Sequence, residues 1–239
     1  MVLIGMKNLK TENMISVITL TYKRHHLLEE AIESFLAQEN PPECEMVVIN
    51  DNPDVDYVFD HPSVRIINHK ERFSSVGAKL EWGFKQCKYD YMYRLDDDDL
   101  LAPWALRNVQ ADIESNPGFE IYRSKGMHFF SDNKYQGEGG SVNNGNVYTK
   151  AYIDRIKVPE TSIGEDSDMT FGNNSKIYTS KLEHTMIYRW GMGTLHISGM
   201  GNVSDEAVLA QADRVLNDAK GEITLNPHFK NDYYVQLPK

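Results

Sequence analysis

Short apolar runs alternate with amphipathic stretches along the first half of the chain, and this alternation restricts the fold more than any other feature. Residues 15–20, 46–49 and 64–67 are rich in β-branched side chains and have the length of buried strands. Residues 27–36 and 76–87 carry apolar side chains at helical spacing. Strands separated by helices in this way predict an α/β domain with a mostly parallel sheet.

A fourth expected strand, residues 89–95, runs directly into four consecutive aspartates, Asp96 to Asp99. The second strand likewise ends in a polar segment, residues 50–52. Ligands of such sheets bind beyond the carboxyl ends of the strands, so both segments are expected to border a binding site. Four adjacent carboxylates repel one another, and a hard divalent cation such as Mg²⁺ or Mn²⁺ relieves that repulsion. A solvated acidic turn is the alternative interpretation.

Composition restricts the class of protein further. Hydrophobic residues make up 41% and charged residues 25% of the 239 residues, so one sizeable domain can bury a core. The formal net charge of −10 disfavours general electrostatic binding of nucleic acid or anionic membranes. No apolar run approaches the roughly 20 residues that span a bilayer, and residues 1–14 lack a secretory signal. We therefore expect a cytoplasmic protein without a transmembrane anchor.

The second half of the chain has weaker signals. Residues 131–146 are rich in Gly, Asn and Ser and are interpreted as a loop, either a lid over an active site or a plain solvent-exposed excursion. A helix is predicted over residues 205–219, with Ser204 as its N-cap and Gly221 beyond its end.

Several segments resemble motifs of family 2 glycosyltransferases, in the family's order. Residues 15–24, with the sequence ISVITLTYKR, resemble the family's opening SVIxPTYNR. The later segments and the family motifs that they resemble are residues 28–38 (LxxAxxSxLxQ), 47–52 (VVDDGS), 77–83 (GAKRNxG), 95–103 (LDDDDxxxP), 164–168 (GEDxD) and 188–198 (YRxH…S). The resemblance covers about residues 15–200.

This resemblance implies a GT-A type of α/β fold, in which a Rossmann-like, mostly parallel central sheet is flanked by helices and joined by a smaller C-terminal acceptor-side region. It also implies a division of the chain. Residues 1–14 would be an N-terminal extension and residues 15–202 the GT-A domain, of which 15–125 bind the nucleotide-sugar and 126–202 form the acceptor side. Residues 203–239 would be a C-terminal helical extension.

The resemblance further implies roles for individual residues. The nucleotide would be bound by Thr21, Tyr22, Asp51, Lys79 and Asp97. The cation would be held mainly by Asp98, with Asp96 as the first acid of the pair and His196 as an extra metal or phosphate contact. The general base would be Asp166.

Three of these residues have a second interpretation. Asp166 could be a carboxylate that stabilises a helix N-terminus, because Glu165 and Asp166 would both lie in a first turn. Lys79 could be an ordinary solvated lysine on a helix. His196 could be structural, since it lies between two apolar residues.

Taken together, the motifs imply transfer of a sugar from a nucleoside-diphosphate sugar, with a UDP-sugar as the default donor, to an acceptor hydroxyl with inversion. A Mn²⁺ or Mg²⁺ ion would stabilise the charge of the departing diphosphate. The acceptor stays open between a glycan, a lipid-linked intermediate, a protein and a small molecule, with a modified nucleic-acid base as a minority view.

Two other classes of protein remain as alternatives. A nucleotidyltransferase often has a glycine-rich phosphate loop after its first strand, whereas residues 21–24 contain no glycine. A catalytically inactive nucleotide-sugar-binding module would keep the fold without turnover. Leu20, Asn50 and Glu81 depart from the family motifs, but these changes remove neither the metal acids nor the base, so we expect an active enzyme.

Overall fold

The four apolar runs of the first half become neighbouring strands of one sheet. The structure is a computed structural model and describes residues 13–191, 204–216 and 220–238. Strand β1 (Ile15–Thr21) pairs in parallel with β2 (Cys44–Asn50) on one side and with β5 (Tyr91–Arg94) on the other. Strand β4 (Val64–Asn68) extends the sheet beyond β2, also in parallel.

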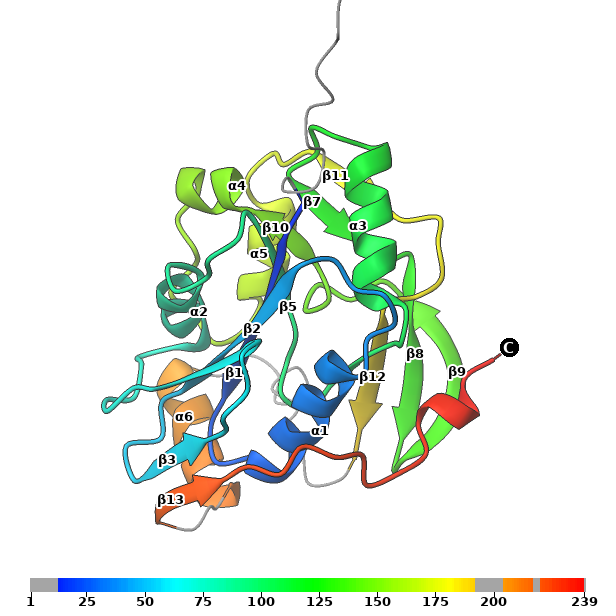
Figure 1. Ribbon diagram of the computed structural model, residues 1–239. Coiled ribbons are helices and arrows are strands. Elements are labelled where there is room, and N and C mark those ends of the chain that lie inside the picture. The colour runs from blue at the N-terminus through cyan, green and yellow to red at the C-terminus, as the bar shows by residue number, and fades with distance from the viewer. Residues whose placement is uncertain (1–12, 192–203, 217–219, 239) are drawn as a thin grey trace, which may run out of the picture.

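The complete central sheet has seven strands in the order β11-β7-β10-β5-β1-β2-β4 (Figure 1). Strand β10 is antiparallel to both of its neighbours, and the other pairs are parallel. The further strands are β3 (Val55–Val58), β6 (Leu100–Leu101), β7 (Ile121–Arg123), β8 (Gly126–Ser131), β9 (Lys134–Gly140), β10 (Val147–Thr149), β11 (Ile177–Thr179), β12 (Met186–Trp190) and β13 (Gly221–Thr224). The predicted mostly parallel sheet is confirmed.

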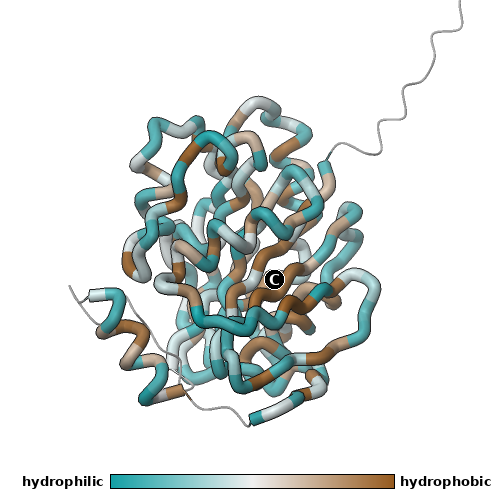
Figure 2. The backbone as a smooth tube through the Cα atoms, turned by 90° about the vertical axis from the view of Figure 1, so that its left-hand side faces the viewer, coloured by the Kyte–Doolittle hydropathy of each residue, from teal (hydrophilic) through white to brown (hydrophobic). Residues whose placement is uncertain are grey.

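Helices cover both faces of this sheet, because alternate strand residues are apolar on both sides. Ile15 and Val17 face one apolar cluster, and Ile18 faces another, as period-two alternation requires. The helices are α1 (His25–Leu36), α2 (Val76–Phe84), α3 (Ala105–Ser115), α4 (Lys150–Arg155), α5 (Glu165–Phe171), α6 (Asp205–Val215) and the 3₁₀ turn η2 (Tyr234–Gln236). Helices α1 and α3 contribute to the first cluster, and α2, α4 and α5 to the second. Figure 2 shows the apolar segments concentrated on the interior strands.

A second sheet, in the order β6-β12-β8-β9, lies beside the central one. Its outer hairpin corrects the prediction of a loop over residues 131–146, because residues 134–140 form strand β9. The two residues of its turn, Asp132 and Asn133, both have positive φ, 47° and 65°. Such a turn matches the twist of an antiparallel pair, and Asp and Asn tolerate the left-handed conformation better than most residues.

The C-terminal region returns to the body of the protein in three places. Helix α6 begins as predicted, with the Ser204 side chain accepting a hydrogen bond from the Ala207 N–H at 3.3 Å, but it ends at Val215. Strand β13 then pairs in parallel with β3. Tyr233, next to η2, is buried against Phe130 of the second sheet. In the described part of the chain, no helix is both long and apolar enough to cross a bilayer.

Gly77 fixes the position of the segment that leads to α5. Its backbone N–H donates to the carbonyl of Thr161 at 2.9 Å, and a Cβ on Gly77 would lie 1.8 Å from the carbonyl oxygen of Pro159. Only glycine allows two backbones to approach so closely. The N-terminus of α2 therefore holds residues 159–163 against the carboxyl end of the central sheet.

Candidate active site

The four aspartates follow β5 and occupy two different environments. Asp96 and Asp98 line a cavity of about 500 Å³ at the carboxyl end of the central sheet. Asp97 and Asp99 are buried in the protein, with 0% and 1% of their surface exposed. Such burial disfavours a charged carboxylate unless cations or hydrogen-bond donors compensate it. The solvated acidic turn that was the alternative interpretation is therefore wrong.

Arg24 supplies the first compensating charge, from the residue that precedes α1. Its Nη1 donates to Asp98 Oδ2 at 2.9 Å, and its Nε donates to Asp97 Oδ2 at 3.2 Å. Burial still raises the pKa of Asp97 to about 6, although the guanidinium of Arg24 acts in the opposite direction. Arg24 also lines the cavity.

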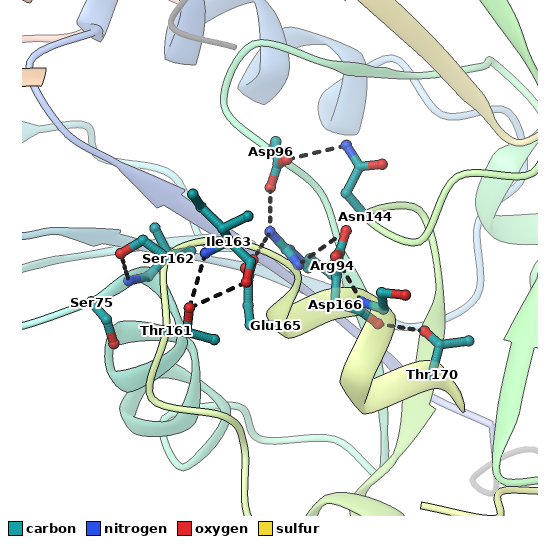
Figure 3. Close-up of polar contacts among 12 residues, drawn as sticks. Ser75, Arg94, Asp96, Asn144, Thr161, Ser162, Ile163, Glu165, Asp166 and Thr170 are labelled. Atoms are coloured by element: carbon teal, nitrogen blue, oxygen red, sulfur yellow. Dashed lines mark hydrogen bonds and ion pairs between the residues drawn. The ribbon is translucent and has the colours of Figure 1, made fainter. Parts of the chain in front are cut away.

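Arg94, the last residue of β5, connects the aspartates with the start of α5 (Figure 3). Its Nη2 lies 3.0 Å from Glu165 Oε1 and 3.4 Å from Asp96 Oδ1, and its Nη1 lies 3.9 Å from Asp166 Oδ2. Burial raises the pKa of Glu165, and the charge of Arg94 opposes that shift. One buried guanidinium therefore contacts both groups of acids that the motifs had singled out.

Arg189 of β12 supplies the third guanidinium. Its Nε donates to the backbone carbonyl of Asp98 at 2.6 Å, and its backbone N–H donates to Asp99 Oδ1 at 2.9 Å. Its Nη1 lies 2.7 Å from Glu30 Oε2, and both side chains of this ion pair are about 2% exposed or less. Asn144 completes the group by donating to Asp96 at 3.1 Å and to Asp99 at 2.8 Å.

The geometry of the acids suits a hard cation. Carboxylate oxygens of Asp96, Asp98 and Asp99 lie within 4.8 Å of one another, and oxygen ligands are those that Mg²⁺ and Mn²⁺ prefer. Asp99 was not expected among them, and its hydrogen bonds to Arg189 and Asn144 tie it to the protein interior. His196 lies outside the described residues.

Asp166 lies at the second position of α5 and lines the same cavity as Asp96 and Asp98. Its side chain is 29% exposed, and its Oδ1 accepts the backbone N–H of Ser167 at 2.7 Å. That position in the first turn also fits a carboxylate that stabilises the helix N-terminus. Its role as general base therefore stays a prediction.

The predicted nucleotide-binding residues divide into two groups. Thr21, Tyr22 and Lys79 line the cavity. Asp51 and Asp97 are not among the described residues that line it, and both are buried. Lys79 is only 5% exposed, with its Nζ 2.5 Å from Asp51 Oδ1 and 2.6 Å from the carbonyl of Thr21, so its interpretation as a solvated lysine is wrong.

Asn50, which replaces an acid of the family motif, serves the packing of the strands. Its Nδ2 donates to the carbonyl of Val55 at 2.8 Å and to Asn68 Oδ1 at 2.9 Å. Its side chain is fully buried. A carboxylate cannot donate these two hydrogen bonds, which explains why an amide suits this position.

Sequence reasoning missed the arginines around the site and the contribution of α6. Arg72 lies over the Tyr22 ring, with 3.8 Å from its Cζ to the ring centroid, and its Nη1 is 2.6 Å from Asp213 of α6. Helix α6 also contributes three residues to the lining of the cavity, Val208, Leu209 and Ala212. The sequence could have indicated Arg94 as a site residue, since it is a charged residue at the end of an otherwise apolar strand. Nothing in the sequence of residues 205–215 indicated that they contribute to the site.

The class of protein follows from comparison with known families. The family model described as Glycosyl transferase family 2 matches residues 16–161, more than half of the chain. The chain therefore belongs to glycosyltransferase family 2. A Haemophilus influenzae protein described as "Uncharacterized glycosyltransferase" is 28% identical over 101 residues, which are 40% of this chain and 38% of that protein.

Solved structures with the same fold agree with this assignment. S. aureus TarS 1-349 in complex with UDP-GlcNAc superposes with a TM-score of 0.64 at 17% identity, over 85% of this chain and 65% of that one. The mannosyltransferase PcManGT from Pyrobaculum calidifontis, in complex with GDP-Man and Mn²⁺, superposes with a TM-score of 0.57 at 14% identity, over 86% and 65%. At these identities the likeness concerns the fold. The chain spans less than two thirds of the length of each of these relatives.

The Arg189–Glu30 pair generates a prediction about stability. Replacing Arg189 by Met leaves the Glu30 carboxylate buried without its cation, and we expect unfolding in urea to require about 3–5 kcal/mol less free energy. The matched control is Arg107→Met, because Arg107 pairs with Glu39 at 2.9 Å on the surface, where the expected loss is below about 1 kcal/mol. Equal losses in the two variants would contradict the structural role given to Arg189.

Proposed function

We propose that this protein transfers a sugar from a nucleoside-diphosphate sugar to an acceptor hydroxyl, with the help of a divalent cation and with inversion at the anomeric carbon. The observation that carries the proposal is one cavity lined by the acids Asp96 and Asp98, by the carboxylate of Asp166, and by Thr21 and Tyr22 at the end of β1. The nucleotide-sugar complexes named for the two structural neighbours support a donor of this class.

The nucleoside end of the donor is assigned to the part of the cavity next to β1. Arg72 stacks on the Tyr22 ring, and both side chains line the cavity, so together they offer a planar surface against which a nucleobase can lie. Lys79 and Asp51 form a buried pair behind Thr21 that holds the end of β1 in place. Arg24 and Arg72 bring positive charge to the cavity wall, as a diphosphate requires. UDP is the nucleotide that we propose first.

Asp98 and Asp96 are the proposed ligands of Mn²⁺ or Mg²⁺. Both line the cavity, and both offer carboxylate oxygens close to each other. When bound, such a cation stabilises the negative charge that develops on a departing nucleoside diphosphate. Arg24, which contacts Asp98 at 2.9 Å, holds that carboxylate in the orientation from which it serves as a ligand.

Asp166 is the proposed general base. The acceptor oxygen attacks the anomeric carbon, the bond from that carbon to the diphosphate oxygen breaks with its electron pair leaving on the diphosphate, and the hydroxyl proton passes to the Asp166 carboxylate. Attack from the side opposite the leaving group inverts the configuration of the anomeric carbon. Arg94 at 3.9 Å keeps the carboxylate of Asp166 directed toward the acids after β5.

Binding of the donor generates the first functional prediction. In a thermal-shift screen of UDP-, GDP- and dTDP-sugars, we expect one donor to raise Tm by several degrees with Mn²⁺ and by much less without it, since a ligand at 100 times its Kd stabilises by about 2.7 kcal/mol. The variant Asp98→Ala should lose the additional shift that Mn²⁺ causes. If no nucleotide-sugar changes Tm in either condition, the donor assignment is wrong.

The general base generates a second prediction, about turnover. We expect Asp166→Asn to keep the donor-induced shift of Tm but to lose about 100-fold or more of the metal-dependent release of nucleoside diphosphate, because general base catalysis contributes about that much. Asp168→Asn is the matched control, since Asp168 is an exposed acid in the same first turn. Equal activity of both variants would mean that Asp166 only stabilises the helix. If the unmodified protein binds a donor but shows no turnover, the proposed transfer is wrong and the alternative of a catalytically inactive nucleotide-sugar-binding module is favoured.

A further inference from the structure

A row of three aromatic rings leads away from the cavity along the second sheet. Tyr188 and Trp190 belong to β12 and alternate there with the buried Arg189, so their side chains lie on the face away from the core. Phe129 of β8 is the register partner of Tyr188. The ring centroids of Phe129 and Tyr188 are 6.4 Å apart, and those of Phe129 and Trp190 are 6.3 Å apart.

The row begins in the candidate active site and ends at the surface of the protein. Tyr188 lines the cavity together with Asp96, Asp98 and Asp166. Phe129 is partly buried, and Trp190 at the far end is 41% exposed. Large aromatic side chains on a surface mark binding sites when they are contiguous with a cavity.

The strand next to the row leaves it accessible. Gly137 of β9 is the register partner of Phe129, and a Cβ built on it would meet no described atom within 4 Å. The segment 141–144 lines the same cavity and contributes the Ser141 hydroxyl and the amides of Asn143 and Asn144, together with the apolar side chain of Val142. A ligand that extends from the cavity onto the row therefore meets hydrogen-bonding groups in the cavity and aromatic rings along β12 and β8.

We propose that this row, Tyr188, Phe129 and Trp190, binds the successive sugar rings of an oligosaccharide acceptor. A sugar ring has an apolar face of C–H groups and a periphery of hydroxyls, which matches a site that combines aromatic rings with polar cavity-lining groups. The ring that carries the attacking hydroxyl lies against Tyr188, and the rings that follow lie along Phe129 and Trp190. This inference rests on the proposed function and names the acceptor that the proposed function left open.

Two other occupants fit the surface less well. An acyl chain beside Tyr188 would cover the carboxylates of Asp96, Asp98 and Asp166 without offering hydrogen bonds or positive charge in return. A folded protein partner needs about 800 Å² of surface on each side, which a single row of three rings does not supply. An oligosaccharide offers apolar ring faces to the aromatic row and hydroxyl groups to the polar residues of the cavity.

The test is binding of the labelled protein to an array of immobilised di- to hexasaccharides of varied composition. We expect binding to a subset of them, weakened about tenfold in Trp190→Ala, as truncation of an aromatic anchor does, and largely retained in Trp190→Phe. The matched control is Phe171→Ala, because Phe171 is a more exposed aromatic residue, at 56%, and is not among the described residues that line the cavity. Circular dichroism checks that each variant is folded.

Donor chemistry separates failure of this inference from failure of the proposed function. We expect Trp190→Ala to release nucleoside diphosphate from the donor at the unmodified rate in the absence of acceptor. Binding of no oligosaccharide, or undiminished binding by Trp190→Ala, overturns the acceptor assignment while donor turnover still upholds the proposed function. Binding to phosphatidylcholine and phosphatidylglycerol vesicles that depends on Trp190, with no saccharide bound, also overturns it in favour of a lipid acceptor. If the unmodified protein binds neither a nucleotide-sugar donor nor a saccharide, both proposals are wrong.

Discussion

Four consecutive carboxylates can stay at the end of a buried strand only where positive charge is brought to them, and this protein brings three guanidinium groups. Arg24 reaches Asp97 and Asp98, and Arg94 reaches Asp96. The guanidinium of Arg189 donates to the backbone carbonyl of Asp98, and its backbone N–H donates to the carboxylate of Asp99. These arginines come from the start of α1, the end of β5 and β12, so the acids hold three distant parts of the chain together. Arg94 and Arg189 are buried and Arg24 is partly buried, and low dielectric strengthens their attraction to the acids.

The same three contacts arrange the parts of the proposed transfer site. The end of β1 and the acids after β5 border the cavity because parallel strands end at one edge of the sheet. Arg94 brings α5, with Asp166, to that edge, and Arg189 fixes β12, whose other face carries the aromatic row. Structural cost and proposed function therefore lie in one group of residues, because the carboxylates that repel one another are those proposed to bind the cation.

Local patterns predicted β1, β2, β4 and β5 of the central sheet, because buried strands and amphipathic helices leave periodic signals in their own residues, whereas the three-residue strands β7, β10 and β11 are too short to leave one. The hairpin of β8 and β9 was missed, since glycine-rich β9 lacks apolar alternation and its turn depends on Asp132 and Asn133. Most of the candidate site residues in recognisable motifs line one cavity, including Asp98 and Asp166, whereas Asp51 and Asp97 are buried and are not among its lining residues. Their partners could not be predicted. Pairs such as Arg189 with Glu30, or Arg72 with Asp213, depend on tertiary contacts between residues far apart in the chain.

The central claim is that the acids after β5 hold a cation that in turn holds a sugar-linked diphosphate. The most direct measurement is a crystal structure of the protein with Mn²⁺ and the donor from the thermal-shift screen, in which anomalous scattering locates the manganese. The account predicts a manganese peak at about 2.0–2.3 Å from carboxylate oxygens of Asp98, with diphosphate oxygens completing its coordination. A donor bound elsewhere in the protein, with no manganese at Asp96 or Asp98, would contradict it.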